Sequence, residues 1–140
     1  RFAAIFVRTP RARDQLGPPR HPAPQHPRGL AAQRDEEAIE TWWQYWQPVV
    51  AALSQERGFY QPTRERYLAE VDKGALFVGS PETVARKIAT MARALHLDRF
   101  DLKYDVMHLP REARARTIEL LGREVAPRVR ELLAKEAARA

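Results

Sequence analysis

Cysteine is absent from this chain of 140 residues. Its absence excludes a disulfide framework, thiolate catalysis and metal sites built on cysteine. Apolar runs of membrane-spanning length are also missing, and no signal peptide is visible. The sequence contains no P-loop, dinucleotide-binding glycine fingerprint, nucleophile elbow or metal-ligand spacing. These absences, with a length that suits one domain, favour a cytoplasmic protein without a bound metal or a membrane partner.

The excess of positive over negative charge is confined to the first quarter of the chain. Residues 1–34 contain seven arginines and one acidic residue, Asp14, so they carry the whole formal charge of +6. The same segment holds six of the eleven prolines and shows no apolar periodicity. Such a segment buries too little surface to offset its ordering entropy. We therefore expect residues 1–34 to be irregular, apart from an edge strand at residues 2–7. Because the arginines are scattered, nucleic acid is not the expected partner.

The composition changes at Asp35, where we place a domain edge that leaves residues 35–140 as the folded part. Asp35 is a suitable N-cap, and Gly58 suits the end of the same helix. An apolar stripe at helical spacing runs between them, and it includes Trp42, Trp43 and Trp46. Large aromatic residues on one helix face usually belong to a core or an interface, which we prefer to a ligand-stacking role. A second helix is expected to begin after Thr63.

The segment from Gly74 to Ile88 predicts a strand, a tight turn and a helix. Residues 75–78 form a short apolar run between two glycines, as in a buried strand. Ser80 is a natural N-cap, and Pro81 suits the first position of a helix. The apolar stripe that follows predicts a helix over residues 81–95. A strand, a turn and a capped helix form a βα unit, which is the building block of parallel sheets.

A second unit follows the first. Residues 100–106 alternate strictly between apolar and polar side chains, which is the period of a strand. After Pro110 a long helix is expected, with a stripe of apolar residues at Ile118, Leu121, Val125, Val129 and Leu132. The sequence therefore predicts an α/β protein, rich in helix, with two βα units preceded by helices.

Candidate site residues lie where parallel strands end, because working side chains gather there in such folds. Gly79 and Ser80 follow the first strand, and the helix start at Ser80 either binds an anion or only caps the helix. Lys103 and Asp105 share the polar face of the second strand with Asp101. This face either lines the interior of a barrel with a solvent-filled mouth or forms a ladder of salt bridges. His108 lies beyond that strand, either as an acid or base or as a surface residue.

Several segments together resemble the C-terminal part of the luciferase-like flavin-dependent monooxygenases. They include residues 35–38, the tryptophan-rich helix, residues 56–58, 74–84 and 97–104, Leu109-Pro110 and residues 118–127. The similarity runs in unbroken order over about residues 35–134. The first strands of the family, which carry most of its flavin and catalytic contacts, have no counterpart in these 140 residues. In the family a strand leads into the Asp-Glu-Glu-Ala helix, and here the Arg- and Pro-rich segment stands in that place.

This resemblance implies a (β/α)8 barrel of the TIM type, of which residues 75–78 and 100–106 would be strands seven and eight. It implies reduced flavin as the cofactor (FMN, or the deazaflavin F420) and oxygenation of a small organic substrate. Gly79, Ser80 and Lys103 would contact the cofactor, and His108, Lys103 and Asp105 are the catalytic candidates.

Two adjacent parallel strands would leave both sheet edges unpaired, so we expect a homo-oligomer or pairing with a complementary barrel fragment. The alternative function is that of a non-catalytic helical interaction module, which would use the tryptophan face and the basic tail.

Overall fold

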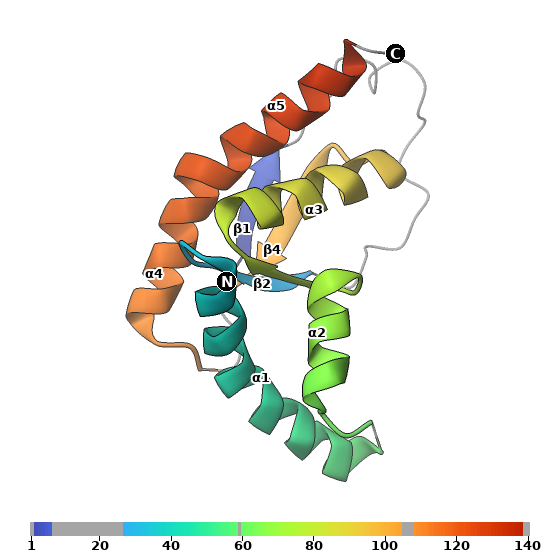
Figure 1. Cartoon of the computed structure of the whole chain (residues 1–140), viewed down its shortest axis with the longest axis vertical. Helices are drawn as coiled ribbons and strands as arrows, with labels where there is room; N and C mark the ends of the chain where they lie inside the picture. Colours follow the sequence, from blue (N-terminus) through green and yellow to red (C-terminus); the bar gives the residue numbers. More distant parts are fainter. Residues whose placement is uncertain (1, 7–26, 59, 105–107, 139–140) are drawn as a thin grey trace.

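The computed structural model describes residues 2–6, 27–58, 60–104 and 108–138 and shows a small sheet with helices around it (Figure 1). The strands are β1 (Phe2–Phe6), β2 (Arg28–Ala31), β3 (Leu76–Gly79) and β4 (Arg99–Lys103). The helices are α1 (Asp35–Arg57), α2 (Arg64–Asp72), α3 (Pro81–Ala94), α4 (Arg111–Leu120) and α5 (Ala126–Ala137), with a π-helical turn η1 (Leu121–Val125) between the last two. The chain is a helix-rich α/β protein, as the sequence predicts.

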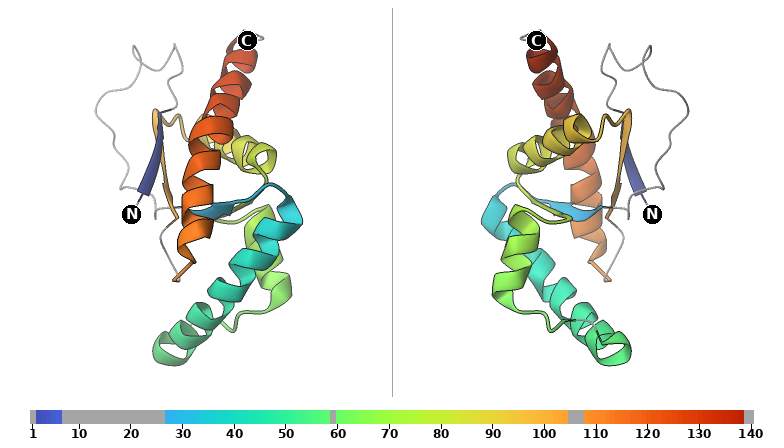
Figure 2. Two further views of the ribbon diagram at one scale, coloured as in Figure 1. Left: turned by 90° about the vertical axis from the view of Figure 1, so that its left-hand side faces the viewer. Right: turned by 90° about the vertical axis from the view of Figure 1, so that its right-hand side faces the viewer.

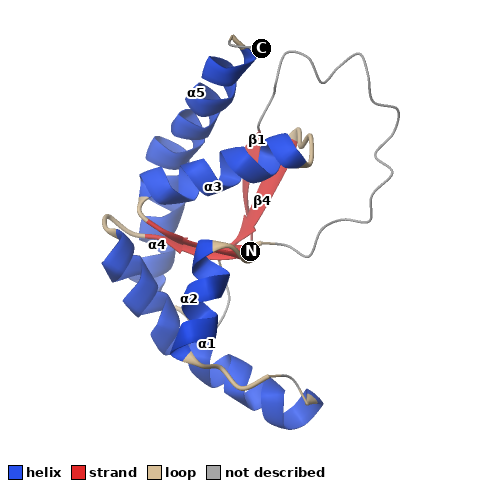
Figure 3. Cartoon of the chain, turned by 45° about the vertical axis from the view of Figure 1, so that its right-hand side comes forward, coloured by secondary structure: helices blue, strands red, loops and turns tan. Residues whose placement is uncertain are grey.

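The strands, which are red in Figure 3, form one sheet. Their order in the sheet is β1-β4-β2-β3. β2 is parallel to β3 over its whole length, from the pair Arg28↔Leu76 to the pair Ala31↔Gly79. β2 also runs parallel to β4, but their pairing is limited to Arg28↔Lys103. β1 lies antiparallel to β4 and forms one edge of the sheet, while β3 forms the other.

This order differs from the one expected for consecutive strands of a barrel. In a closed (β/α)8 barrel, each strand pairs with the next one along the chain. Here β2 lies between β3 and β4, so these two strands are not neighbours. The connection from β2 to β3 crosses toward one edge of the sheet, and the connection from β3 to β4 crosses toward the other edge. Because such crossovers are right-handed, opposite directions place the helices on opposite faces.

Helices indeed cover both faces of the sheet (Figure 2). A separate apolar cluster lies on each face. On one face Phe77, Phe100 and Leu102 pack against α3, η1 and α5. On the other face Leu30, Leu76 and Val78 pack against α1 and α2. Successive residues of β3 enter different clusters because side chains of a strand alternate between the two faces.

The aromatic stripe of the tryptophan-rich helix belongs to the core, as expected from its spacing. Trp42 and Trp46 are buried in the cluster of α1 and α2, and Trp43 is half-buried against it. The ring centroids of Trp43 and Trp46 lie 5.1 Å and 5.2 Å from that of Tyr67. Burial raises the pKa of Tyr67, and its hydroxyl donates to the carbonyl oxygen of Ile39 at 2.7 Å. These rings are packing surface.

The first 34 residues depart in part from the expected irregular structure. β1 is an edge strand, as expected, but β2 is an additional strand within the sheet. Its four residues become a strand through their partners, since Gly29 lets the backbone pass close to Phe77. A Cβ at Gly29 would overlap the carbonyl oxygen of Phe77. Glycine at such a contact looks like a turn signal in the sequence, which is why the strand was not predicted.

Other boundaries agree with the sequence to within a few residues, with two exceptions. β4 ends at Lys103, and residues 105–107 of the expected strand lie outside the described residues. The last helix begins at Arg111 and contains the turn η1, in which the N–H of Ala126 donates to the carbonyl oxygen of Leu121. Pro127 follows directly; it has no N–H to donate, and a π-helical turn accommodates such a break.

Candidate functional site

The turn between β3 and α3 has the cap that the sequence predicts. Ser80 is the N-cap of α3, and its hydroxyl accepts the N–H of Thr83 at 3.4 Å. Pro81 takes the first helical position. The Ser80 hydroxyl also donates to the hydroxyl of Thr83 at 3.2 Å. The candidates Gly79 and Ser80 therefore lie together at the amino end of a helix of 14 residues.

The carboxylate of Asp35 occupies the same turn. Asp35 is not the cap of its own helix, because Arg34 takes the N-cap position of α1 and makes no side-chain cap. The side chain of Asp35 reaches across to α3 instead. Its Oδ1 accepts the N–H of Ser80 at 2.6 Å, and its Oδ2 accepts the hydroxyl of Thr83 at 3.0 Å. The expected anion position thus holds a carboxylate of the chain itself.

These contacts determine the charge of Asp35. Partial burial works to raise its pKa, but the hydrogen bonds from Ser80 and Thr83, with the positive charge of Arg86, outweigh it and hold the pKa below its ordinary value of 3.8. The turn also fits closely around the carboxylate, since a Cβ at Gly79 would lie 2.7 Å from Oδ1 of Asp35. Asp35 is therefore an ionised clamp between α1 and α3.

The other candidates lie elsewhere. Lys103 pairs with Arg28 at the amino end of β2, whereas Gly79 pairs with Ala31 at its carboxyl end. With strands about 4.8 Å apart and a rise of about 3.3 Å per residue, Lys103 is roughly 14 Å from Gly79. The backbone N–H of Lys103 donates to the carbonyl oxygen of Pro27, the residue before β2, at 2.8 Å. The structure does not bring Lys103 beside Gly79 and Ser80.

His108 belongs to a third place. It is exposed, has a left-handed backbone with φ of 56°, and lines a shallow hollow of about 480 Å³ on α1, together with Tyr45, Val49 and Leu53. Asp105 lies outside the described residues. On β4, the Nε of Arg99 forms a salt bridge with Oδ1 of Asp101 at 2.9 Å. For Asp101, this contact agrees with the interpretation of the polar face as a ladder of salt bridges.

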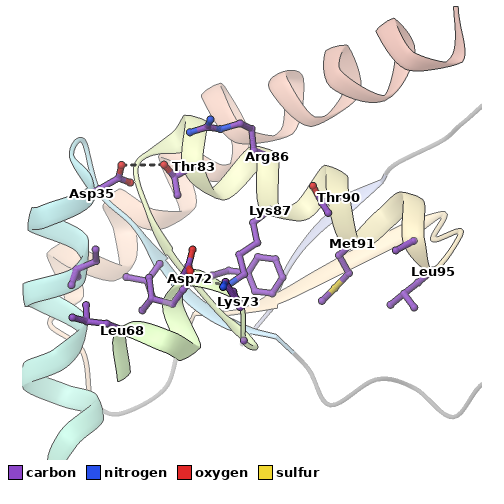
Figure 4. A pocket seen from close by; sticks show the side chains of 16 residues that line it. Asp35, Leu68, Asp72, Lys73, Thr83, Arg86, Lys87, Thr90, Met91 and Leu95 are labelled. Carbon is purple, nitrogen blue, oxygen red and sulfur yellow. Dashed lines mark hydrogen bonds between the residues drawn. The ribbon is translucent and has the colours of Figure 1, made fainter. Parts of the chain in front are cut away.

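A groove with a volume of about 1010 Å³ lies between α2 and α3 (Figure 4). Phe77 and Val78 of β3 are part of its lining. The clamp residues Asp35 and Thr83 lie at one end, and Leu95 lies at the other. The sequence reasoning did not identify this groove, because its walls come from helices that are separated by a strand.

Lys87 is the central residue of the groove. Its Nζ donates to three backbone carbonyl oxygens: Val71 at 2.6 Å, Leu76 at 2.8 Å and Glu70 at 3.3 Å. It also lies 5.2 Å from the centroid of the Phe77 ring. Burial lowers the pKa of Lys87, and the nearby acidic side chains of α2 partly offset this effect. Two of the accepting carbonyls belong to the carboxyl end of α2, where a cation is favoured.

A signal for Lys87 was present in the sequence. It lies three residues after Val84 and four before Met91, both on the apolar stripe of α3. A lysine at such a position is partly buried and needs acceptors. The acceptors are backbone atoms of distant segments, so the sequence did not reveal them.

Neither a protein-family model nor a curated protein sequence matches this chain. Among the described residues, no helix is both long and apolar enough to cross a membrane. Within the same residues, no three metal-ligating side chains lie close enough to hold an ion.

Proposed function

We propose that this chain is the C-terminal part of a luciferase-like flavin-dependent monooxygenase of the cytoplasm. The complete protein would use reduced flavin, FMN or F420, to oxygenate a small organic substrate. The alternation β2-α1-α2-β3-α3-β4, with the three strands parallel, carries this proposal. This order of elements along the chain is the one that the resemblance implies, whereas in the sheet β2 lies between β3 and β4. β2 also precedes the Asp-Glu-Glu-Ala helix, as a strand does in the family that the chain resembles.

The described residues of one chain fit a flavin only in part. A flavin phosphate needs free N–H donors and cations together. At the amino end of α3 the Ser80 N–H is already bonded to Asp35, and Lys103 lies two strands away. The described residues of one chain therefore do not supply a complete flavin site. In the proposed function, Gly79, Ser80 and Lys103 each add contacts to a site that a partner completes.

The sheet edges indicate where a partner would join. β1 and β3 are the two outer strands. At β3, the Leu76 carbonyl already accepts a hydrogen bond from Lys87, and a lysine at a sheet edge opposes the addition of a strand. We therefore expect the partner, a second copy of this chain or a complementary barrel fragment, to pair along β1.

Flavin binding that depends on assembly tests this proposal. FMN and F420 are titrated into the protein at concentrations at which sedimentation shows an assembly and at which it shows a monomer, while tryptophan emission is recorded. We expect saturable quenching in the assembly and little in the monomer. A monomer at all concentrations, or an assembly that binds neither flavin, would contradict the proposal.

The second candidate is a non-catalytic interaction module, and the apolar strip on α1 favours it. Tyr45, Val49 and Leu53 lie at helical spacing, are half-exposed and line the hollow beside His108. A partner helix could pack there. Binding of a protein partner that is lost in Leu53→Ser, together with no flavin binding, would support this candidate. Salt-sensitive DNA binding would point to the basic tail.

A further inference from the structure

The groove between α2 and α3 changes in character along its length (Figure 4). One wall is α3, which contributes Thr83, Lys87 and Met91, each four residues from the last, and its C-cap residue Leu95 follows four residues further on. Residues at this spacing share one face of a helix. The face is polar at Thr83 and Lys87 and apolar at Met91 and Leu95. Leu68 of α2, which is 41% exposed, is part of the lining as well.

The charged end of the groove carries more positive than negative charge. Its cations are Lys73, Arg86 and Lys87, and its carboxylates are Asp35 and Asp72. Both oxygens of Asp35 already accept hydrogen bonds from α3 and its cap, so this carboxylate is turned to the protein. Arg86 lies 3.8 Å from Glu82 at the surface. Among the described carboxylates, none forms an ion pair with Lys73 or Lys87.

The groove does not suit an added strand. A peptide that pairs with β3 needs the carbonyl oxygen of Leu76, which already accepts a hydrogen bond from Lys87. This ammonium also binds two carbonyls at the end of α2, so it is held in place. The occupant must therefore use the apolar surface and the positive charge without pairing to the backbone.

We propose that this groove binds an amphipathic organic anion, with its acidic group near Lys73 and Lys87 and its apolar body along Met91 and Leu95. Leu95 lies eight residues after Lys87, a rise of about 12 Å along the helix to its C-cap, which suits an apolar body of about six to ten carbon atoms. This inference does not depend on the proposed flavin chemistry. None of these groove residues belongs to the proposed flavin contacts.

The test is a titration with phenylbutyrate, followed by the backbone amide shifts of the isotope-labelled protein. We expect saturable shifts at residues 87–95 and no comparable shifts at residues 114–118 of α4. The neutral phenylbutanol should bind roughly two- to fivefold more weakly, as expected for the loss of partly screened charge contacts. Equal binding of acid and alcohol, or shifts that do not saturate, would overturn the proposal.

Two matched pairs of variants locate the site. Leu95→Ser should weaken phenylbutyrate binding by about fivefold, whereas Ile118→Ser should not, although both side chains are large, apolar and exposed (53% and 46%). Lys73→Gln should weaken it by roughly two- to fivefold, whereas Lys135→Gln on α5 should not.

The same variants separate the proposal from its rival occupant. If Leu95→Ser leaves phenylbutyrate binding unchanged, or if it abolishes self-association in sedimentation, the proposal is wrong. In the second case a second copy of the chain fills the groove. Flavin quenching is measured on the same samples, and its absence bears only on the proposed function.

Discussion

Replacement of Asp35 by alanine tests whether the contact between α1 and α3 stabilises the fold. Asp35→Ala removes a charged acceptor from the Ser80 N–H at 2.6 Å and from the Thr83 hydroxyl at 3.0 Å. A hydrogen bond to a charged group contributes about 1.5–3 kcal/mol, and the partial exposure of Asp35 places it at the low end. We expect a loss of about 2–3 kcal/mol in the free energy of unfolding, measured by urea denaturation at one fixed protein concentration.

The matched control is Glu36→Ala. Glu36 is the next residue of the same first turn, is exposed, and shares the favourable interaction with the helix dipole. Glu36→Ala should therefore lower the free energy of unfolding by about 0.5 kcal/mol. Equal losses in the two variants would refute the cross-helix contact, because only the effect of the dipole would then remain.

The same carboxylate gives stability a defined pH dependence. The pKa of Asp35 is lower in the folded chain than its ordinary value of 3.8. The ionised carboxylate therefore contributes fully at pH values above 3.8, and this contribution is lost as the pH falls through the lower folded pKa. The difference in stability between the wild type and Asp35→Asn should shrink below pH 3.8; a constant difference would contradict the assignment.

Three further substitutions are predicted. Gly29→Ala should lower the free energy of unfolding, measured by urea denaturation, by about 3 kcal/mol or more, because the new Cβ would overlap the carbonyl oxygen of Phe77. Gly122→Ala should be neutral or stabilising, because a Cβ there would meet nothing within 4 Å. Equal effects of the two substitutions would refute the β2–β3 contact. Lys87→Met should destabilise the fold by about 2–3 kcal/mol by leaving carbonyls unpaired, and an unchanged urea midpoint would contradict this. Trp42→Ala should cost about 3–5 kcal/mol, because Trp42 is fully buried, and a loss below about 1 kcal/mol would place it outside the core.

Local structure was predictable where the signal lies within a few residues. The cap at Ser80, the stripe of α3 and the buried face of Trp42 and Trp46 follow from spacing and side-chain type alone. Ile118 and Leu95 also lie on the expected stripes, yet both are exposed. Among the described elements none covers these two side chains fully, and periodicity does not contain that information.

The arrangement of the elements was not predictable to the same degree. Strand β2 is four residues long and depends on its partners, so it carries no period of its own. Its insertion between β3 and β4 sets the strand order and separates Lys103 from Ser80. The same holds for Asp35, which has the sequence signature of a cap for α1 but stabilises the start of α3. In each case a contact across more than forty residues decides the outcome.

The measurement that tests the proposed function most directly is the titration of the assembled chain with FMN and F420, followed by tryptophan emission. The account predicts saturable quenching that follows the degree of assembly in sedimentation and fades on dilution to the monomer. Quenching that is absent for both flavins in a well-formed assembly would contradict it.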